Sequence, residues 1–203
     1  MKRYLGLFAC VVLNISGAVA SPYYIDATVS VTEFPEADIG ATDATLTQDR
    51  TDVGFGISLG YAASENTNIE ISYINHGTYQ NEMQLNFPPY SNGPNSKYEL
   101  DISSFLLGFR SNFPASESTS IDILVGIHRW DLDGISNGVS YSEGVFQGFT
   151  TEKHTKSGTD PVYGIGATYS LTDNIALKPS LSRFEIDSDV INSLVFGISY
   201  HLR

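Results

Sequence analysis

The sequence predicts an all-β fold: an eight-stranded antiparallel transmembrane β-barrel with short periplasmic turns and long extracellular loops. The first observation is a period of two, which places alternate residues on opposite faces of a strand. In the last 44 residues of the chain, bulky side chains at one phase of the period alternate with small or polar ones, as in Leu194-Val195-Phe196-Gly197-Ile198-Ser199. The second is that the non-bulky face is rich in Gly and Ser, which suits the crowded interior of a narrow barrel. The third is that short and long connections alternate along the chain.

The alternation predicts eight strands. The third fades toward Gln80, and in the fourth the apolar residues Tyr98, Leu100 and Ile102 lie on the phase opposite to Phe105 and Phe109. A β-bulge, or a rim above the membrane, would explain that change. The strands are predicted at residues 23–32, 51–61, 68–80, 98–113, 121–130, 163–169, 175–182 and 194–202.

The connections predict which end of the barrel faces outward. Three long segments rich in polar residues, glycine and proline are expected to be loops, and a fourth long-side connection at 185–189 is the shortest. Outer-membrane barrels have short turns on the periplasmic side and long loops outside, whereas a β-sandwich has no reason to alternate so regularly. The long loops are predicted at residues 33–50, 81–97 and 131–158, and the short turns at 63–67, 114–120 and 171–174.

The N-terminus is typical of a secretory signal peptide. Lys2 and Arg3 precede a short apolar run, and Ala18-Val19-Ala20 forms a small-x-small cleavage site. Cleavage between Ala20 and Ser21 is therefore expected, which leaves residues 21–203 as one barrel domain. The predicted signal also contains the one cysteine, so a disulfide is not expected in the mature chain.

The charge balance excludes some partners. The formal net charge is −12, and losing Lys2 and Arg3 with the signal takes it to −14. Such a surface disfavours nucleic acid, which rewards basic proteins.

Aromatic side chains gather near the strand ends, as expected at the two membrane interfaces, although Tyr and Phe are also common in strands generally. Those near short turns or the C-terminus are Tyr61, Phe109, Phe113, Tyr169 and Tyr200, with Tyr23 on the same side; Tyr73, Tyr163 and Trp130 lie toward the loops, with Trp130 on the inward phase.

The closing third resembles OmpA-type transmembrane barrels, and the stand-alone barrel resembles the small OmpX- and Ail-like surface proteins. The residues that carry the resemblance are Pro161-Val162-Tyr163, Gly164–Tyr169, Ile175-Ala176-Leu177-Lys178 and Leu194–Leu202. The resemblance implies a barrel in the outer membrane of a Gram-negative bacterium. Its partners would be outer-membrane lipid, lipopolysaccharide and the outer-membrane assembly machinery. Unlike full OmpA-type proteins, this protein is expected to consist of the barrel without a peptidoglycan-binding domain, and the sequence ends in Tyr200-His201-Leu202-Arg203 rather than in an aromatic residue.

The inward phase carries several charged residues, for which we expect an interior charge network because charges in a narrow barrel need partners. The resemblance supports it, since an inward base at the position of Lys178 pairs with interior carboxylates in related barrels. The alternative is that Lys178 and one acid lie near the rim in water. The predicted members are Lys178, Glu70, Asp122, Asp26 and His128.

The sequence contains no clear catalytic or metal-binding motif. Four scattered histidines form no recognisable nucleophile–base pair, and Asp122 and His128 are roughly 20 Å apart along one strand. The acidic segment 33–50 has no spaced metal-ligand motif. We therefore expect no catalytic residue, no metal and no cofactor.

The predicted function is a structural or surface-interaction role through acidic extracellular loops, which could engage a surface ligand. A narrow porin-type channel is the alternative, and ion conductance would distinguish it. A lipid A-modifying enzyme is a third hypothesis, which a shift in the mass of lipid A on expression of the protein would support.

Overall fold

The computed structural model describes residues 22–36, 44–85, 95–142 and 145–202. No helix in this described part is long and apolar enough to cross a membrane. The predicted signal peptide, residues 1–20, and its cleavage site at Ala20 and Ser21 lie outside it, as do residues 37–43 and 86–94 of two predicted loops. The described strands are β1 (Tyr23–Glu33), β2 (Ala44–Asp49), β3 (Thr51–Ser64), β4 (Thr67–Leu85), β5 (Asn95–Pro114), β6 (Thr119–Ser142), β7 (Val145–Ser170), β8 (Ile175–Ile186) and β9 (Asp189–His201).

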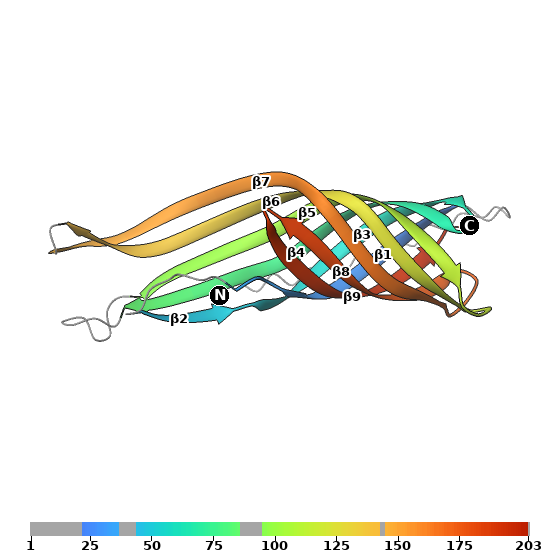
Figure 1. Ribbon diagram of the computed structural model, residues 1–203, viewed down its shortest axis with the longest axis horizontal. Coiled ribbons are helices and arrows are strands. Elements are labelled where there is room, and N and C mark those ends of the chain that lie inside the picture. The colour runs from blue at the N-terminus through green and yellow to red at the C-terminus, as the bar shows by residue number, and fades with distance from the viewer. Residues whose placement is uncertain (1–21, 37–43, 86–94, 143–144, 203) are drawn as a thin grey trace.

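Eight of these strands close into an antiparallel ring, which confirms the predicted barrel (Figure 1). The first strand closes the ring on the last: β1 pairs with β9 from Tyr24↔His201 to Glu33↔Asn192, and with β3 on its other side. The remaining closure is the β4–β5 pair. Closure matters because lipid offers no hydrogen bonds to an open strand edge. β2 stands outside the ring and pairs only with the far half of β4.

The two faces of the ring have the inverse of a soluble protein's polarity. Outward side chains such as Phe196 and Leu181 are each 59% exposed, whereas inward Asp26 and Ser199 are 3% and 1% exposed. The exposed apolar band ends sharply toward the long-connection end, where the next outward residue on each strand is polar. These boundary residues include Glu33, Asn75, Ser103, Arg129, Thr159, Arg183 and Asn192.

The predicted long loop at 131–158 is wrong, because most of it is strand. β6 and β7 pair from Thr119↔Tyr169 to Ser142↔Val145, with one register shift between Ser140 and Tyr141, so the hairpin extends far beyond the apolar band (Figure 1). Most of its described side chains beyond Leu132 are exposed or half-buried, and the backbone ladder forms without any apolar period. β7 pairs with β8 only between Val162 and Ser170. The ends of β2, β4, β5, β6 and β7 therefore form a wall on one side of the barrel, beyond the apolar band.

Two other predicted loops are also shorter than expected. The 33–50 segment contains β2, and the 81–97 segment contains the end of β4 and the start of β5. The predicted loop at 185–189 is a tight turn in which only Asp187 and Ser188 separate β8 from β9. Both have positive φ, 52° and 76°, which is the backbone of a two-residue type I′ hairpin.

A β-bulge decides which residues of β4 face inward. The β4–β5 register shifts between Asn75 and Gly77, and Gly77 has a φ of 93°. A Cβ there would lie 2.7 Å from Oδ2 of Asp52, so glycine is required. After the bulge, odd-numbered residues face inward and Tyr79 becomes buried. The β5–β6 register has no shift, so Tyr98, Leu100 and Ile102 face inward on the regular phase of β5, above the apolar band. A rim above the membrane, and not a bulge in β5, therefore explains why these three apolar residues face inward.

Candidate functional site

An ion-paired cluster from four strands crosses the lumen. Lys178 of β8 donates to Asp26 of β1 at 2.7 Å and to Glu70 of β4 at 3.4 Å. Arg110 of β5 holds the same Glu70 carboxylate through two hydrogen bonds, at 2.7 and 2.9 Å. The Tyr24 hydroxyl of β1 donates to Glu70 Oε1 at 2.6 Å. The cluster thus contains two positive and two negative side chains, and its centre is buried, since Glu70 is 2% exposed. Pairing the opposite charges offsets the cost of removing each of them from water.

The structure brings together only part of the predicted network. Lys178, Asp26 and Glu70 meet, whereas Asp122 and His128 belong to other clusters. Asp122 accepts hydrogen bonds from Ser120 at 3.0 Å and from Thr168 at 2.5 Å, near the short-turn end.

Sequence reasoning missed Arg110 and Tyr24, although both lie on the inward phase of predicted strands. Arg110 is next to outward Phe109, and Tyr24 shares its face with Asp26, so the period of two could have found them. The Tyr24 ring fits because its cross-strand partner is Gly60. A Cβ at Gly60 would lie 1.9 Å from the Tyr24 ring.

A second buried cluster joins a serine to two histidines. Ser104 Oγ lies 2.9 Å from Nε2 of His76 and 3.0 Å from Nδ1 of His128. His128 Nε2 donates to the carbonyl of Glu185 at 2.8 Å, so His128 Nδ1 accepts from Ser104. This is a nucleophile–base contact that the sequence did not reveal. However, Ser104 is 1% exposed and both histidines are 0% exposed, so the cluster is a buried hydrogen-bond network without substrate access. Nδ1 of His76 has no hydrogen-bond partner among the described residues.

An apolar layer closes the lumen between these clusters and the long-connection end. Trp130 of β6 is 2% exposed and donates from Nε1 to Asp160 at 2.6 Å, so it belongs to the interior and not to an interfacial girdle. Phe184 of β8 packs its ring edge against both histidines, at centroid distances of 4.6 and 5.2 Å. Ile102 and Val162 are further buried members of this apolar cluster. Leu106 and Leu124 also belong to it, but they line the interior void beside Glu70 and Arg110.

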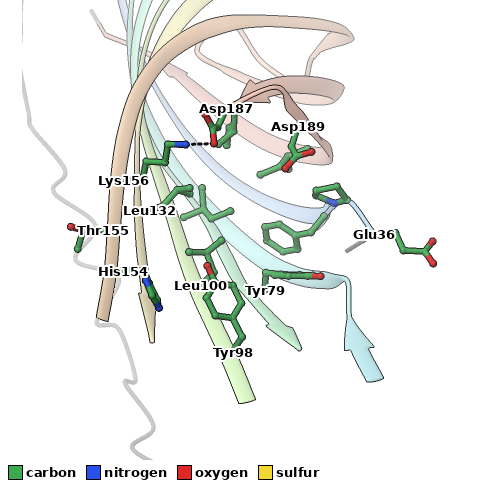
Figure 2. A pocket seen from close by; sticks show the side chains of 15 residues that line it. Glu36, Tyr79, Tyr98, Leu100, Leu132, His154, Thr155, Lys156, Asp187 and Asp189 are labelled. Carbon is green, nitrogen blue, oxygen red and sulfur yellow. Dashed lines mark hydrogen bonds and ion pairs between the residues drawn. The ribbon is translucent and has the colours of Figure 1, made fainter. Parts of the chain in front are cut away.

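An open cavity of about 600 Å³ lies beyond the apolar layer (Figure 2). The wall provides Tyr79, Leu100 and Leu132, and the β8–β9 turn provides Asp187 on the opposite side. Lys156 of β7 forms an ion pair with Asp187 across the cavity mouth. The other lining residues are Phe34, Pro35, Glu36, Tyr98, Ile102, His154, Thr155, Ile186, Asp189 and Ile191.

Comparison with known proteins identifies the family. The outer membrane protein beta-barrel domain matches residues 5–201. The chain belongs to this family. The protein is therefore a bacterial outer-membrane β-barrel, and its long-connection end is the extracellular end. Among curated proteins, none matches the chain.

Solved outer-membrane barrels share the fold at low sequence identity. Pseudomonas aeruginosa OprG is 10% identical with a TM-score of 0.56, over 90% of this chain and 98% of that one. Neisserial surface protein A is 13% identical with a TM-score of 0.50, over 91% and 99%. The N-terminal barrel of Pseudomonas aeruginosa OprF is 11% identical with a TM-score of 0.50, over 91% and 100%. At these identities the three structures show that the fold is shared.

Proposed function

We propose that the protein is a surface-interaction barrel with a closed lumen, which engages its ligand at the extracellular mouth. The observation that carries the proposal is the cavity of about 600 Å³ at the foot of the extracellular wall, directly above a lumen filled by side chains. The rigid ring would hold this mouth clear of the membrane. Outer-membrane lipid and lipopolysaccharide would contact the exposed apolar band, and the outer-membrane assembly machinery would insert it.

The contents of the lumen support closure. The interior polar void that the lumen cluster lines is about 60 Å³, room for only a few waters. On its extracellular side stand Trp130 and Phe184, and across it runs the ion-paired cluster of Lys178, Glu70 and Arg110. A permeating ion would have to displace both layers. Side chains usually fill a barrel of eight strands.

A narrow channel is the alternative function, and that polar void is the observation in its favour. The test is current recording from the barrel refolded into planar bilayers, after a shift in unboiled-gel mobility has shown that it is folded. We expect a silent membrane. Discrete, reproducible openings of the folded barrel would reject the closed lumen and select the channel.

A further inference from the structure

The cavity at the extracellular mouth has an apolar floor of a size that suits a small molecule. Its volume of about 600 Å³ lies in the range of ligand pockets, roughly 300–1,000 Å³. Leu100, Leu132 and Ile186 line it from three different strands. This floor lies above the exposed apolar band, so the membrane does not cover it. The cavity can therefore take an apolar body from the external medium.

Aromatic rings give the cavity a preference for positive charge. The half-buried ring of Tyr98 lines the cavity, beside Phe34 and Tyr79, which pack with ring centroids 5.7 Å apart and are 1% and 7% exposed. The faces of aromatic rings attract cations through their quadrupoles. Burial raises the pKa of the Tyr98 phenol, which keeps that ring neutral at physiological pH.

One polar group in the wall of the cavity has no partner. The Tyr79 hydroxyl belongs to a side chain that is 7% exposed, and its oxygen has no hydrogen bond in the described structure. A buried hydroxyl without a partner is costly, so a ligand that hydrogen-bonds to it gains affinity. The oxygen has almost no exposed surface, so a small movement of the cavity wall would let an N–H group of a bound ammonium reach it as donor.

The rim of the cavity leaves one carboxylate uncompensated. Lys156 is paired with Asp187, and Glu36 is paired with Arg50 at 3.4 Å. Asp189, exposed at the start of β9, has no ion pair or side-chain hydrogen bond among the described residues. The chain's net charge of −12 adds a long-range attraction for cations and a repulsion for anions.

We propose that the extracellular cavity binds a small organic cation that carries an ammonium group on an apolar body. The body occupies the floor of Leu100, Leu132 and Ile186, and the ammonium group lies among the aromatic rings, within reach of Tyr79 and Asp189. This inference rests on the proposed surface-interaction function and adds the class of ligand.

The test compares three probes with the same chain length: hexylammonium, hexan-1-ol and hexanoate. Binding is measured by titration calorimetry on the full barrel in lipid nanodiscs, with empty nanodiscs to subtract partition into lipid. We expect hexylammonium to bind most tightly and hexanoate most weakly. Asp189→Asn should weaken hexylammonium about two- to fivefold, the range of an exposed ion pair, and should leave hexan-1-ol unchanged.

Two further variants separate the site from general charge effects. Tyr79→Phe should weaken hexylammonium about fivefold, the equivalent of one hydrogen bond. Asp133→Asn removes the same charge from an exposed carboxylate of β6, on the other face of the wall, and should change nothing.

The outcomes distinguish this inference from the function on which it rests. Equal binding of all three probes would overturn cation selectivity but leave an apolar ligand site and the surface-interaction function intact. Binding of no probe to a folded barrel would overturn the inference, while a silent bilayer recording would still uphold the closed lumen. Loss of binding in Asp133→Asn as large as in Asp189→Asn would reject the site and indicate nonspecific attraction.

Discussion

Replacing Glu70 by glutamine should cost the folded barrel about 3–5 kcal/mol. Four hydrogen bonds converge on this carboxylate, from Tyr24, from Lys178 and two from Arg110. The side chains of Glu70, Arg110 and Lys178 are 2%, 13% and 10% exposed, so water screens them little. Glu70→Gln keeps the shape, but it leaves two cations against Asp26 alone and turns an amide N–H toward groups that also donate. Breaking a buried pair in this way costs about 3–5 kcal/mol.

The measurement is urea unfolding of the barrel refolded in lipid vesicles. Trp130 is the single tryptophan of the sequence and is 2% exposed, so its fluorescence reports loss of the interior. The matched control is Glu99→Gln, whose pair with Lys97 at 2.5 Å lies on exposed side chains and should contribute only about 0–1 kcal/mol. Adding Arg110→Met to Glu70→Gln should recover part of the loss, because the unpaired charge is removed. If Glu70→Gln costs no more than Glu99→Gln, the cluster does not contribute to stability as argued.

Three other changes test the faces, the interior and the wall by the same unfolding assay. Ile198→Arg places a charge in the exposed apolar band, where Ile198 is 56% exposed, and should cost about 2–4 kcal/mol, whereas Asn192→Arg beyond the band should cost about 0–1 kcal/mol; equal costs would contradict the assigned register. Gly60→Ala pushes a Cβ into the Tyr24 ring and should cost about 1–3 kcal/mol, an effect that should shrink when Tyr24 is replaced by serine. Replacing residues 138–150 by Asn-Gly closes the hairpin at the Asn137↔Thr151 pair and should change stability by less than about 1 kcal/mol. A barrel that no longer folds would show that the far hairpin is not an independent extension.

The sequence was sufficient for the membrane-embedded part of the fold because the physical constraint there is local. A strand with lipid on one face and a packed lumen on the other must alternate, so the chain's own period locates the strands and faces. Lys178, Asp26 and Glu70 were found by this rule, and Arg110 could have been found by it too. Asp122 fits the same rule but bonds to Ser120 and Thr168 instead, because its height along the barrel depends on register.

Beyond the membrane, strands need not alternate apolar and polar residues, so the period of two no longer locates them. In residues 131–158 most of the described side chains beyond Leu132 are exposed or half-buried, so polar side chains occur at either phase and the segment reads as a loop. The bulge at His76 and Gly77 depends on one residue of register between β4 and β5, and a single glycine gives only a faint sign of it. The Ser104 cluster combines residues from three strands, so it becomes visible only when that register is known.

The candidate site depends on two irregular features of the barrel, which lie on different strands. The bulge in β4 turns Tyr79 inward, so it supplies a hydroxyl and an aromatic ring to one side of the cavity. The tight turn at Asp187 and Ser188 ends β8 and β9 early, so it opens the mouth on the other side and supplies Asp189. A regular β4 would point Tyr79 to the outer surface, and a longer β8–β9 hairpin would complete the wall over the cavity. Because the proposed ammonium group lies within reach of both side chains, substitutions at Tyr79 and Asp189 should have effects on ligand affinity that do not add, and additive effects would show that the two residues do not share one ligand group.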